Sequence, residues 1–193
     1  MSLPVEARAL WGDVDRLDVT SLPHNRANGV TRSVDRVRTG GRSAVVKVLG
    51  RHTERVPTHW LPSDDPTHFN YWRREALAYG AGLADAYAGS GLVAPDLLAL
   101  HHREDGSIAL WLEDFGSDDT EWTVDDVVEI ARRLGVAQGR IAVEGGPDHG
   151  WLSRRFLRRS SSAKPIDAGL LDVAEHWGHP LIAGHDPGNL RDG

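Results

Sequence analysis

The first 116 residues alternate between short apolar runs and turn residues, a pattern that predicts a small antiparallel sheet. Residues 43–50, SAVVKVLG, form an apolar run of the kind found in a strand that is buried on both faces. Two glycines in residues 39–42 predict a hairpin that joins this strand to the one before it. A weaker first strand is expected at residues 14–22. Five strands with one inserted helix give a fold of the α+β class.

The inserted helix is predicted over residues 69–88. Apolar residues recur at helical spacing along one of its faces: Trp72, Ala76, Tyr79 and Leu83. Glu75 lies on this stripe, because it is three residues after Trp72 and four before Tyr79. Its carboxylate therefore points toward whatever the apolar face covers, while Arg73 and Arg74 are expected to project toward water.

Helical patterns continue beyond residue 116. Residues 123–126 resemble a capping box in which aspartate replaces the usual glutamate. The residues that follow place one apolar face on a long helix: Val127, Ile130, Ala131, Leu134, Ala137 and Ile141. We therefore divide the chain into a first lobe, residues 1–116, and a partial helical lobe, residues 117–193. An apolar helix surface left exposed on the second lobe would favour self-association.

Composition indicates a cytoplasmic protein that binds neither nucleic acid nor a membrane. The 193-residue chain carries a formal net charge of −6, so we interpret the arginine-rich residues 151–159 as a solvated helix face. No apolar stretch is long enough to span a bilayer, and the amino terminus lacks the core of a signal peptide. Cysteine is absent, which excludes disulfides and thiolate metal sites.

Lys47 interrupts the apolar run at residues 43–50, although a buried strand does not tolerate an unpaired ammonium. Lys164 is the only other lysine, because the chain takes nearly all its positive charge as arginine. Two interpretations of Lys47 fit. It is a compact point charge of the kind that meets phosphates, or it lies on an edge strand and its head reaches water. Glu75 either pairs with Lys47 or is solvated among the neighbouring arginines.

Four segments, in this order along the chain, resemble the aminoglycoside phosphotransferase family, which are small-molecule kinases with a protein-kinase-like fold. They are residues 29–47, with a Thr-Gly-Gly hairpin and the strand lysine; 72–77, WRREAL; 91–100, GLVAPDLLAL; and 107–116, SIALWLEDFG. The resemblance implies a kinase-like N-terminal lobe in which Lys47 and Glu75 orient the phosphates of ATP bound with Mg²⁺. It also implies that the hinge segment with Glu113 and Phe115 faces the adenine ring. A hydroxylated small molecule would accept the phosphate.

Two loops leave their roles open. Residues 24–29, HNRANG, have the Asn and Gly residues for backbone contacts to an anion, or they are an ordinary hairpin connection. Residues 51–67 hold three prolines and no sustained period, so we interpret them as a surface excursion or a lid. The histidines in and beside this segment, His52, His59 and His68, have no repeating metal-ligand spacing and are expected to be solvated.

The catalytic loop of the family has no good counterpart at the carboxyl end. The family often reads HGDLHPGN there, whereas residues 184–193 read GHDPGNLRDG. Asn189 follows Asp186 after three residues instead of five, and only four residues remain for a second metal-binding aspartate. The resemblance therefore implies a phosphotransferase that is truncated and inactive on its own.

The alternative is a complete protein that reuses the lobe as a partner-binding module or as a different catalytic module. The chemical version of this alternative is a metal site made by His176, His179 and His185. Proline and glycine interrupt any helix there, however, so neutral loop histidines fit the sequence better.

Overall fold

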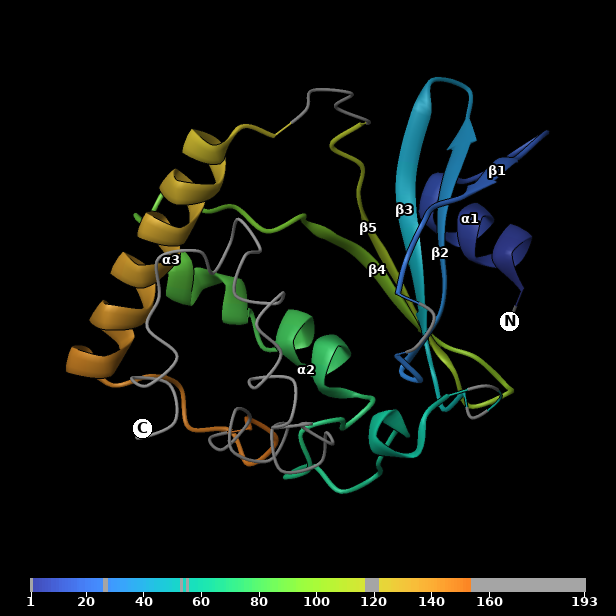
Figure 1. Cartoon of the computed structure of the whole chain (residues 1–193). Coiled ribbons are helices and arrows are strands. Elements are labelled where there is room, and N and C mark those ends of the chain that lie inside the picture. The colour runs from blue at the N-terminus through green and yellow to red at the C-terminus, as the bar shows by residue number, and fades with distance from the viewer. Residues whose placement is uncertain (1, 26–27, 53, 55, 117–121, 154–193) are drawn as a thin grey trace, which may run out of the picture. The chain divides into compact units, whose positions relative to one another are not determined.

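The computed structural model of the chain describes residues 2–25, 28–52, 54, 56–116 and 122–153. They belong to the first of two compact units, residues 1–154 and 155–193. Five antiparallel strands form one sheet in the order β1-β2-β3-β5-β4 (Figure 1). The elements are α1 (Leu3–Trp11), β1 (Asp18–Ser21), β2 (Thr31–Thr39), β3 (Arg42–Leu49), η1 (Thr58–Trp60), α2 (Arg74–Gly80), η2 (Leu83–Tyr87), β4 (Leu97–His102), β5 (Ile108–Glu113) and α3 (Val124–Glu144). The predicted α+β class and the five-stranded antiparallel sheet are confirmed. The division at residues 116 and 117 stays a prediction.

The sheet buries side chains on both faces, which explains the continuous apolar run of β3. On one face, Val46 lies opposite Trp111 of β5, and both pack in a core cluster with Ala7 of α1. On the other face, Leu49 and Leu110 pack in a second cluster with Trp72, just before α2, and with Ala76 of α2. The two helices accordingly lie on opposite sides of the sheet (Figure 1).

The sequence pattern did not predict α1, and a buried ion pair joins this helix to the sheet. Glu6 is fully buried, and its two carboxylate oxygens accept hydrogen bonds from Arg103 Nε and Nη2 at 2.6 and 2.7 Å. Trp111 Nε1 donates to the same carboxylate at 3.1 Å. The ring of Trp11 meets that of Trp111 edge to face, with centroids 5.4 Å apart. The first helix is therefore fixed to the sheet by charge as well as by packing.

Two predicted elements are shorter in the structure. The first strand, predicted over residues 14–22, is limited to Asp18–Ser21, all of whose residues are exposed. The helix predicted over residues 69–88 divides into α2 and the 3-10 helix η2. Gly82 separates them and has a left-handed backbone, with φ of 63°. Glycine is a poor helix former and takes this conformation without steric cost, so the chain turns there instead of continuing the helix.

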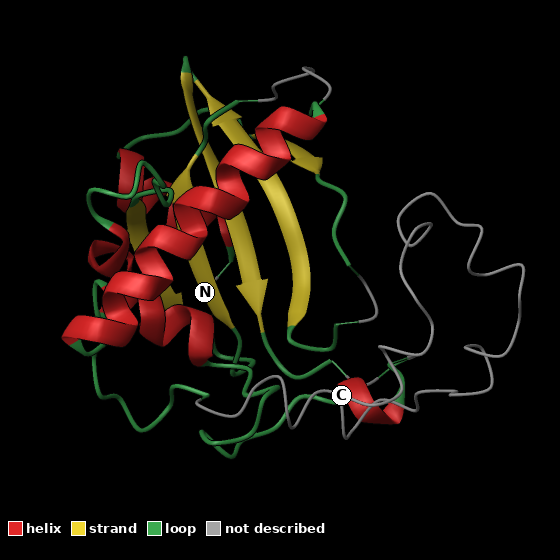
Figure 2. Cartoon of the chain, turned by 60° about the vertical axis from the view of Figure 1, so that its left-hand side comes forward, coloured by secondary structure: helices red, strands yellow, loops and turns green. Residues whose placement is uncertain are grey.

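The helix α3 is uninterrupted over 21 residues (Figure 2). The capping box is confirmed: Asp126 N donates to Thr123 Oγ1 at 3.2 Å, and Thr123 N donates to Asp126 Oδ2 at 2.9 Å. None of the helices in the described residues is long and apolar enough to cross a membrane.

The predicted apolar face of α3 is buried only in part. Ala137 is the only buried residue of this helix, whereas Val127 and Leu134 remain 55% and 37% exposed. Two arginines instead attach α3 to the segment after α2. Arg133 donates to the carbonyl of Gly91 at 2.9 Å, and Arg140 donates to that of Ala86 at 2.8 Å. Hydrogen bonds from arginines therefore hold α3 in place, where the sequence pattern predicted apolar packing.

Candidate functional site

Lys47 and Glu75 meet in the structure, as predicted. Lys47 Nζ lies 2.6 Å from Glu75 Oε2 and 2.9 Å from Glu75 Oε1. The lysine is on β3, which is the central strand of the sheet, and its cross-strand neighbours are Val34 and Leu110. An edge-strand lysine that extends into water is therefore excluded. The ammonium group rises from apolar surroundings and is held by a single carboxylate from the helix above it.

The ion pair is only partly enclosed. The side chains of Lys47 and Glu75 keep 26% and 35% of their surface exposed. A salt bridge at this exposure adds little to folding stability, because water screens the charges. The ammonium group has three donors, and in the structure it lies within hydrogen-bond distance of the two oxygens of Glu75. The pair is therefore not a main source of core stability.

Arg74 fixes the start of α2 and so the position of Glu75. The prediction that Arg74 projects toward water is wrong, because its guanidinium donates to four backbone carbonyls: those of Pro66, His68, Phe69 and Trp151, at 3.1, 2.6, 2.7 and 2.8 Å. Burial lowers the pKa of this guanidinium. These four carbonyl groups surround the guanidinium at the first turn of α2, so Arg74 points inward and not toward water. Arg73 instead stacks on the ring of Trp72, with its Cζ 4.7 Å from the centroid.

The segment at residues 51–67 is tied to the residues before α2. Trp72 Nε1 donates to Asp64 Oδ1 at 2.9 Å, and Arg51 pairs with the same carboxylate at 2.6 Å. Asn70 Nδ2 donates to the carbonyls of Trp60 and Leu61. The described residues of segment 51–67 therefore support the start of the helix that carries Glu75, while the choice between a surface excursion and a lid stays a prediction.

A second ion pair lies on the same face of the sheet and was missed by the sequence analysis. Arg36 of β2 is the cross-strand neighbour of Val45 on β3, and Val45 is in turn the neighbour of Leu112 on β5. Val45 is two residues from Lys47 along β3. Arg36 Nε lies 2.9 Å from Asp114 Oδ2, with the side chains 12% and 3% exposed. Because side chains two residues apart on a strand share a face, Arg36 and Lys47 line one surface.

Asp114 organises the chain where β5 ends. Its carboxylate accepts hydrogen bonds from Ser43 Oγ and from Gly116 N, the latter at 3.0 Å, in addition to the pair with Arg36. Arg36 Nη2 also donates to the carbonyl of Gly116 at 2.8 Å. Burial alone would raise the pKa of Asp114, but the hydrogen bonds from Ser43, Gly116 and Arg36 lower it below the ordinary value of 3.8. The predicted hinge is thus held in one conformation by a buried carboxylate.

Glu113 and Phe115 lie at this end of β5, three and five residues after Leu110, the neighbour of Lys47. Glu113 N donates to the carbonyl of Asp96 at 2.9 Å, and the Glu113 carboxylate accepts from Asp96 N at 3.3 Å. Phe115 is 62% exposed. The structure thus brings Lys47 and Glu75 into contact, whereas Glu113 and Phe115 lie farther along the strand.

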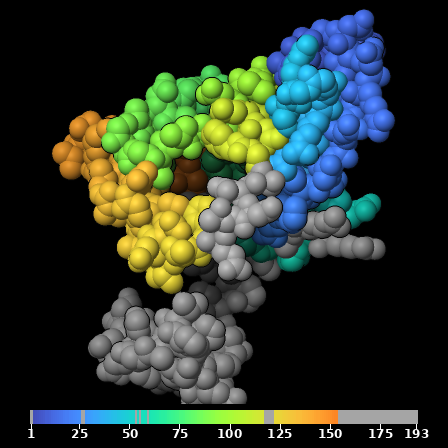
Figure 3. All heavy atoms as spheres, turned by 90° about the horizontal axis from the view of Figure 1, so that it is seen from above, coloured from blue at the N-terminus to red at the C-terminus, as the bar shows by residue number. Residues whose placement is uncertain are grey.

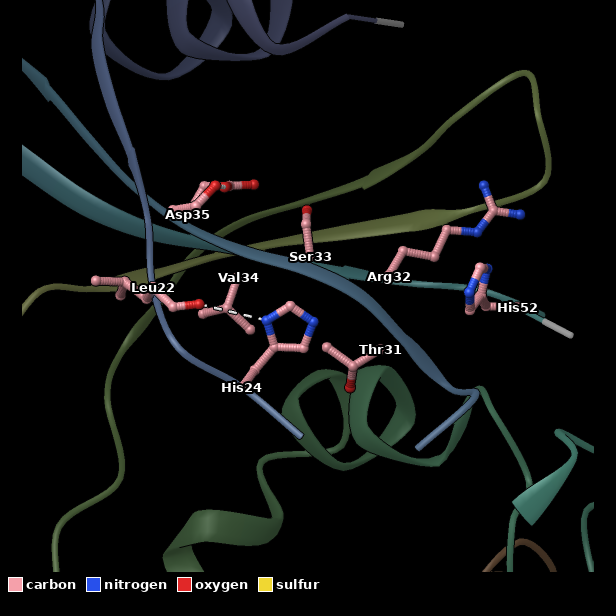
Figure 4. Close-up of a pocket in the computed structure, with 9 residues that line it drawn as sticks. Leu22, His24, Thr31, Arg32, Ser33, Val34, Asp35 and His52 are labelled. Atoms are coloured by element: carbon pink, nitrogen blue, oxygen red, sulfur yellow. Dashed lines mark hydrogen bonds between the residues drawn. The ribbon is translucent and has the colours of Figure 1, made fainter. Parts of the chain in front are cut away.

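A polar pocket of about 260 Å³ lies where β1 ends and β2 begins (Figure 4). Its lining includes His24, Arg32, Val34 and His52. Val34, one of these lining residues, is also the cross-strand neighbour of Lys47 on β3. Arg32 is already paired with Asp105, at 2.6 Å. Of the loop at residues 24–29, His24 lines this pocket, and the anion-contact interpretation of the loop stays a prediction.

Gly29 in this loop is required by packing. A Cβ atom built on it would lie 2.6 Å from the carbonyl oxygen of His52 and 2.8 Å from Pro62 Cδ. These distances are shorter than real Cβ atoms show, and one of the contacts is to backbone. The glycine therefore allows the loop to approach the segment that follows β3.

We expect Gly29→Ala to lower the free energy of unfolding by about 1–3 kcal/mol, because the added methyl group has no space. Urea unfolding followed by circular dichroism measures this. Gly80→Ala is the matched control, since a Cβ at Gly80 meets nothing within 4 Å. Equal stability of the two variants would contradict the close approach described for Gly29.

Histidines give no metal site in the part of the chain that the structure describes. No group of three or more His, Cys, Asp or Glu residues there could hold a metal ion. His68 Nδ1 accepts a hydrogen bond from Asn70 N at 3.1 Å, and His52 lines the pocket at β2. The side chain of His59 is not described. The carboxyl-terminal residues singled out by sequence lie outside the described residues: Lys164, His176, His179, His185, Asp186 and Asn189.

Comparison with known proteins adds no relative. No model of a known protein family matches the chain, and neither a curated protein nor a solved structure does. The likeness to the aminoglycoside phosphotransferases therefore rests on the four sequence segments.

Proposed function

We propose that residues 14–116 bind ATP, with Lys47 contacting the phosphates, and that the chain is related to small-molecule phosphotransferases of the aminoglycoside phosphotransferase type. The observation that carries the proposal is the partly open ion pair of Lys47 and Glu75 on the central strand of the sheet. Burying part of a lysine in apolar surroundings costs free energy. That cost is hard to explain by stability, because an ion pair at this exposure contributes little.

A phosphate ligand would account for the arrangement. The Glu75 carboxylate restricts the ammonium group of Lys47 to one position, so less conformational entropy is lost when the ligand binds. The negative phosphates would then meet a lysine that is already oriented. Two partly buried apolar residues beside Lys47 on this face, Val34 and Val45, offer a surface on which an adenine ring could pack. Glu113 and Phe115, held in place through Asp114, would contact the edge of the ring.

Mg²⁺ would enter with the nucleotide, as the resemblance to this family implies. The phosphate oxygens supply part of the coordination that Mg²⁺ prefers, and a protein commonly adds one or two carboxylates. The acceptor class proposed is a hydroxylated small molecule, again from the resemblance.

Calorimetric titration of the chain with ATP and Mg²⁺ tests the proposal. We expect saturable binding with a dissociation constant in the micromolar to millimolar range. ATP should bind more tightly than adenosine, because the phosphates provide the contact with Lys47. An absence of heat with ATP under conditions where the chain is folded would favour the alternative, a lobe used for binding a partner or for different chemistry.

We expect binding without phosphate transfer. Catalysis of phosphoryl transfer depends on positioning and on metal electrostatics, and the spacing of Asp186 and Asn189 does not match the family's loop. The measurement is transfer of labelled phosphate from ATP to a panel of aminoglycosides and other hydroxylated molecules. Turnover that Asp186→Asn abolishes would contradict this expectation and would make Asp186 a catalytic residue.

A further inference from the structure

The guanidinium of Arg74 connects two parts of the chain that are far apart in sequence. Its hydrogen bonds to described residues all go to backbone carbonyls. Three of these acceptors lie five to eight residues before it, whereas the fourth, the carbonyl of Trp151, lies 77 residues after it and accepts from Arg74 Nε at 2.8 Å. Burial of a cation costs free energy that carbonyl dipoles only partly return. Arg74 therefore ties the start of α2 to the chain that follows α3.

The start of α2 has few other constraints of its own. The helix has seven residues, and no side chain caps its N-terminus. A helix this short does not persist in water without tertiary contacts. Arg74 is its first residue and Glu75 its second. The position at which the carbonyls hold Arg74 therefore sets where the Glu75 carboxylate lies.

The chain after α3 leaves from a helix that is itself attached to the segment after α2. Arg133 and Arg140 make that attachment through the carbonyls of Gly91 and Ala86. Figure 3 shows the yellow-to-orange atoms of α3 beside the green atoms of this segment. From the end of α3 the chain runs below α2 in the view of Figure 1, where Trp151 meets Arg74.

Residues 149–152 form a compact turn, which we call the latch segment. The rings of His149 and Trp151 are stacked, with centroids 4.9 Å apart and planes 9° from parallel. Leu152 N donates to the carbonyl of His149 at 3.0 Å. The stacked rings and the turn hold the Trp151 carbonyl in one orientation, which is the orientation that Arg74 Nε requires.

We propose that the latch segment keeps the Glu75 carboxylate on Lys47, with Arg74 as the positioning residue between them. Displacing the latch segment would remove one acceptor of Arg74 and loosen the first turn of α2, so Glu75 would hold Lys47 less firmly. This assigns a regulation of the ion pair to a part of the chain that does not touch it. The effect on the ion pair follows from these contacts, whereas the effect on ATP rests on the proposed function.

Trace acetylation of the whole folded chain with acetic anhydride tests the latch in the absence of nucleotide. The reagent attacks the neutral amine, and the Glu75 carboxylate favours the charged form of Lys47. The chain has two lysines, so the ratio of acetylation at Lys47 to that at Lys164, measured by mass spectrometry, has an internal reference. Glu75→Gln should raise this ratio about two- to fivefold, the factor that corresponds to a partly exposed ion pair.

Two variants break the connection at different points. Arg74→Met removes the guanidinium, and Trp151→Ala removes the ring that stacks on His149 but keeps Arg74. Both should raise the acetylation ratio, by no more than Glu75→Gln does. Arg73→Met is the matched control: it removes the same charge from the neighbouring residue, whose guanidinium lies over the Trp72 ring, and should leave the ratio unchanged.

A double variant shows whether Arg74 acts through Glu75. Arg74→Met added to Glu75→Gln should raise the ratio no further than Glu75→Gln alone, because the carboxylate that Arg74 positions is already gone. A rise that adds in full would overturn the inference. An unchanged ratio in the Trp151→Ala variant, with circular dichroism showing it folded, would overturn it as well, and this holds even if Arg74→Met does not fold.

Calorimetric titration with ATP and Mg²⁺ then tests the effect on the proposed function. Arg74→Met should lower the affinity by about the same factor as Glu75→Gln, whereas Arg73→Met should bind like the wild type. A wild-type chain that binds no ATP but shows the expected acetylation ratios would contradict the proposed function and support the latch.

Discussion

Replacing Arg103 by leucine is expected to lower the free energy of unfolding by about 3–5 kcal/mol, the usual cost of leaving one member of a buried ion pair without its partner. Glu6 has no exposed surface, and its two carboxylate oxygens are bonded to the Arg103 guanidinium. Without that guanidinium the carboxylate would stay buried, and among the described residues Trp111 Nε1 would be its one remaining side-chain donor. Urea unfolding of the variant measures the effect.

Two further variants separate this effect from a general loss of charge. Arg16→Leu removes an arginine whose side chain is 84% exposed, and it should change stability by no more than about 0.5 kcal/mol. The double variant Glu6→Leu with Arg103→Leu should recover part of the loss, because no unpaired buried charge then remains at this site. A cost for Arg103→Leu as small as that for Arg16→Leu would show that α1 does not depend on this pair.

The same carboxylate links stability to pH. Burial alone would raise the pKa of Glu6, but hydrogen bonds from Arg103 and Trp111 outweigh it, so the pKa is lowered from the ordinary value of 4.5. A lowered pKa in the folded state means that the unfolded chain binds the proton more tightly. The contribution of Glu6 to stability is therefore complete above the unfolded pKa and is lost as the pH falls through the folded pKa. Asp114, whose pKa is also lowered, acts in the same direction.

Replacing Lys47 by alanine is expected to reduce the affinity for ATP with Mg²⁺ by about 10- to 100-fold. A hydrogen bond to a charged group contributes about 1.5–3 kcal/mol, and each 1.4 kcal/mol corresponds to a tenfold change. Lys47→Arg should lose less, because the charge remains, although the guanidinium does not reproduce the compact ammonium group. Calorimetric titration of the wild type, Lys47→Ala and Lys47→Arg with ATP and Mg²⁺ gives the order of their affinities.

Glu75→Gln separates positioning from direct contact. It removes the carboxylate 2.6 Å from Lys47 Nζ but leaves the ammonium group, so affinity should fall less than in Lys47→Ala. Arg16→Ala is the control for loss of one positive charge at an exposed position and should bind ATP like the wild type. Equal affinity of Lys47→Ala and the wild type would contradict a phosphate contact at this residue.

The Lys47–Glu75 pair could be predicted because each residue carries a local signal. A lysine inside an apolar strand needs a partner, and a glutamate on the apolar stripe of the next helix is directed toward the sheet. The division of the predicted helix at Gly82 was less accessible, since the stripe continues through Tyr79 to Leu83 although the backbone turns. A periodic pattern records which face is apolar and does not record where the backbone leaves the helix.

The ion pairs of Asp114 and Glu6 could not be predicted in the same way. Arg36 and Asp114 are 78 residues apart, and Arg103 and Glu6 are 97 apart. Each arginine is one of many in a chain that uses arginine for nearly all its positive charge. The strand order and register decide which arginine meets which carboxylate, and the local sequence pattern predicts neither of them.

Acylation with an ATP derivative that carries a reactive acyl group on its terminal phosphate tests whether nucleotide phosphates reach Lys47. Such a probe transfers its acyl group to a lysine amine held near the phosphates, forming an amide and releasing the nucleotide. The chain has two lysines, so Lys164 serves as the internal control in the same sample. We expect mass spectrometry to find Lys47 modified in preference to Lys164, with excess ATP suppressing the modification at Lys47 only. Equal modification of both lysines that ATP does not change would contradict nucleotide binding at the ion pair.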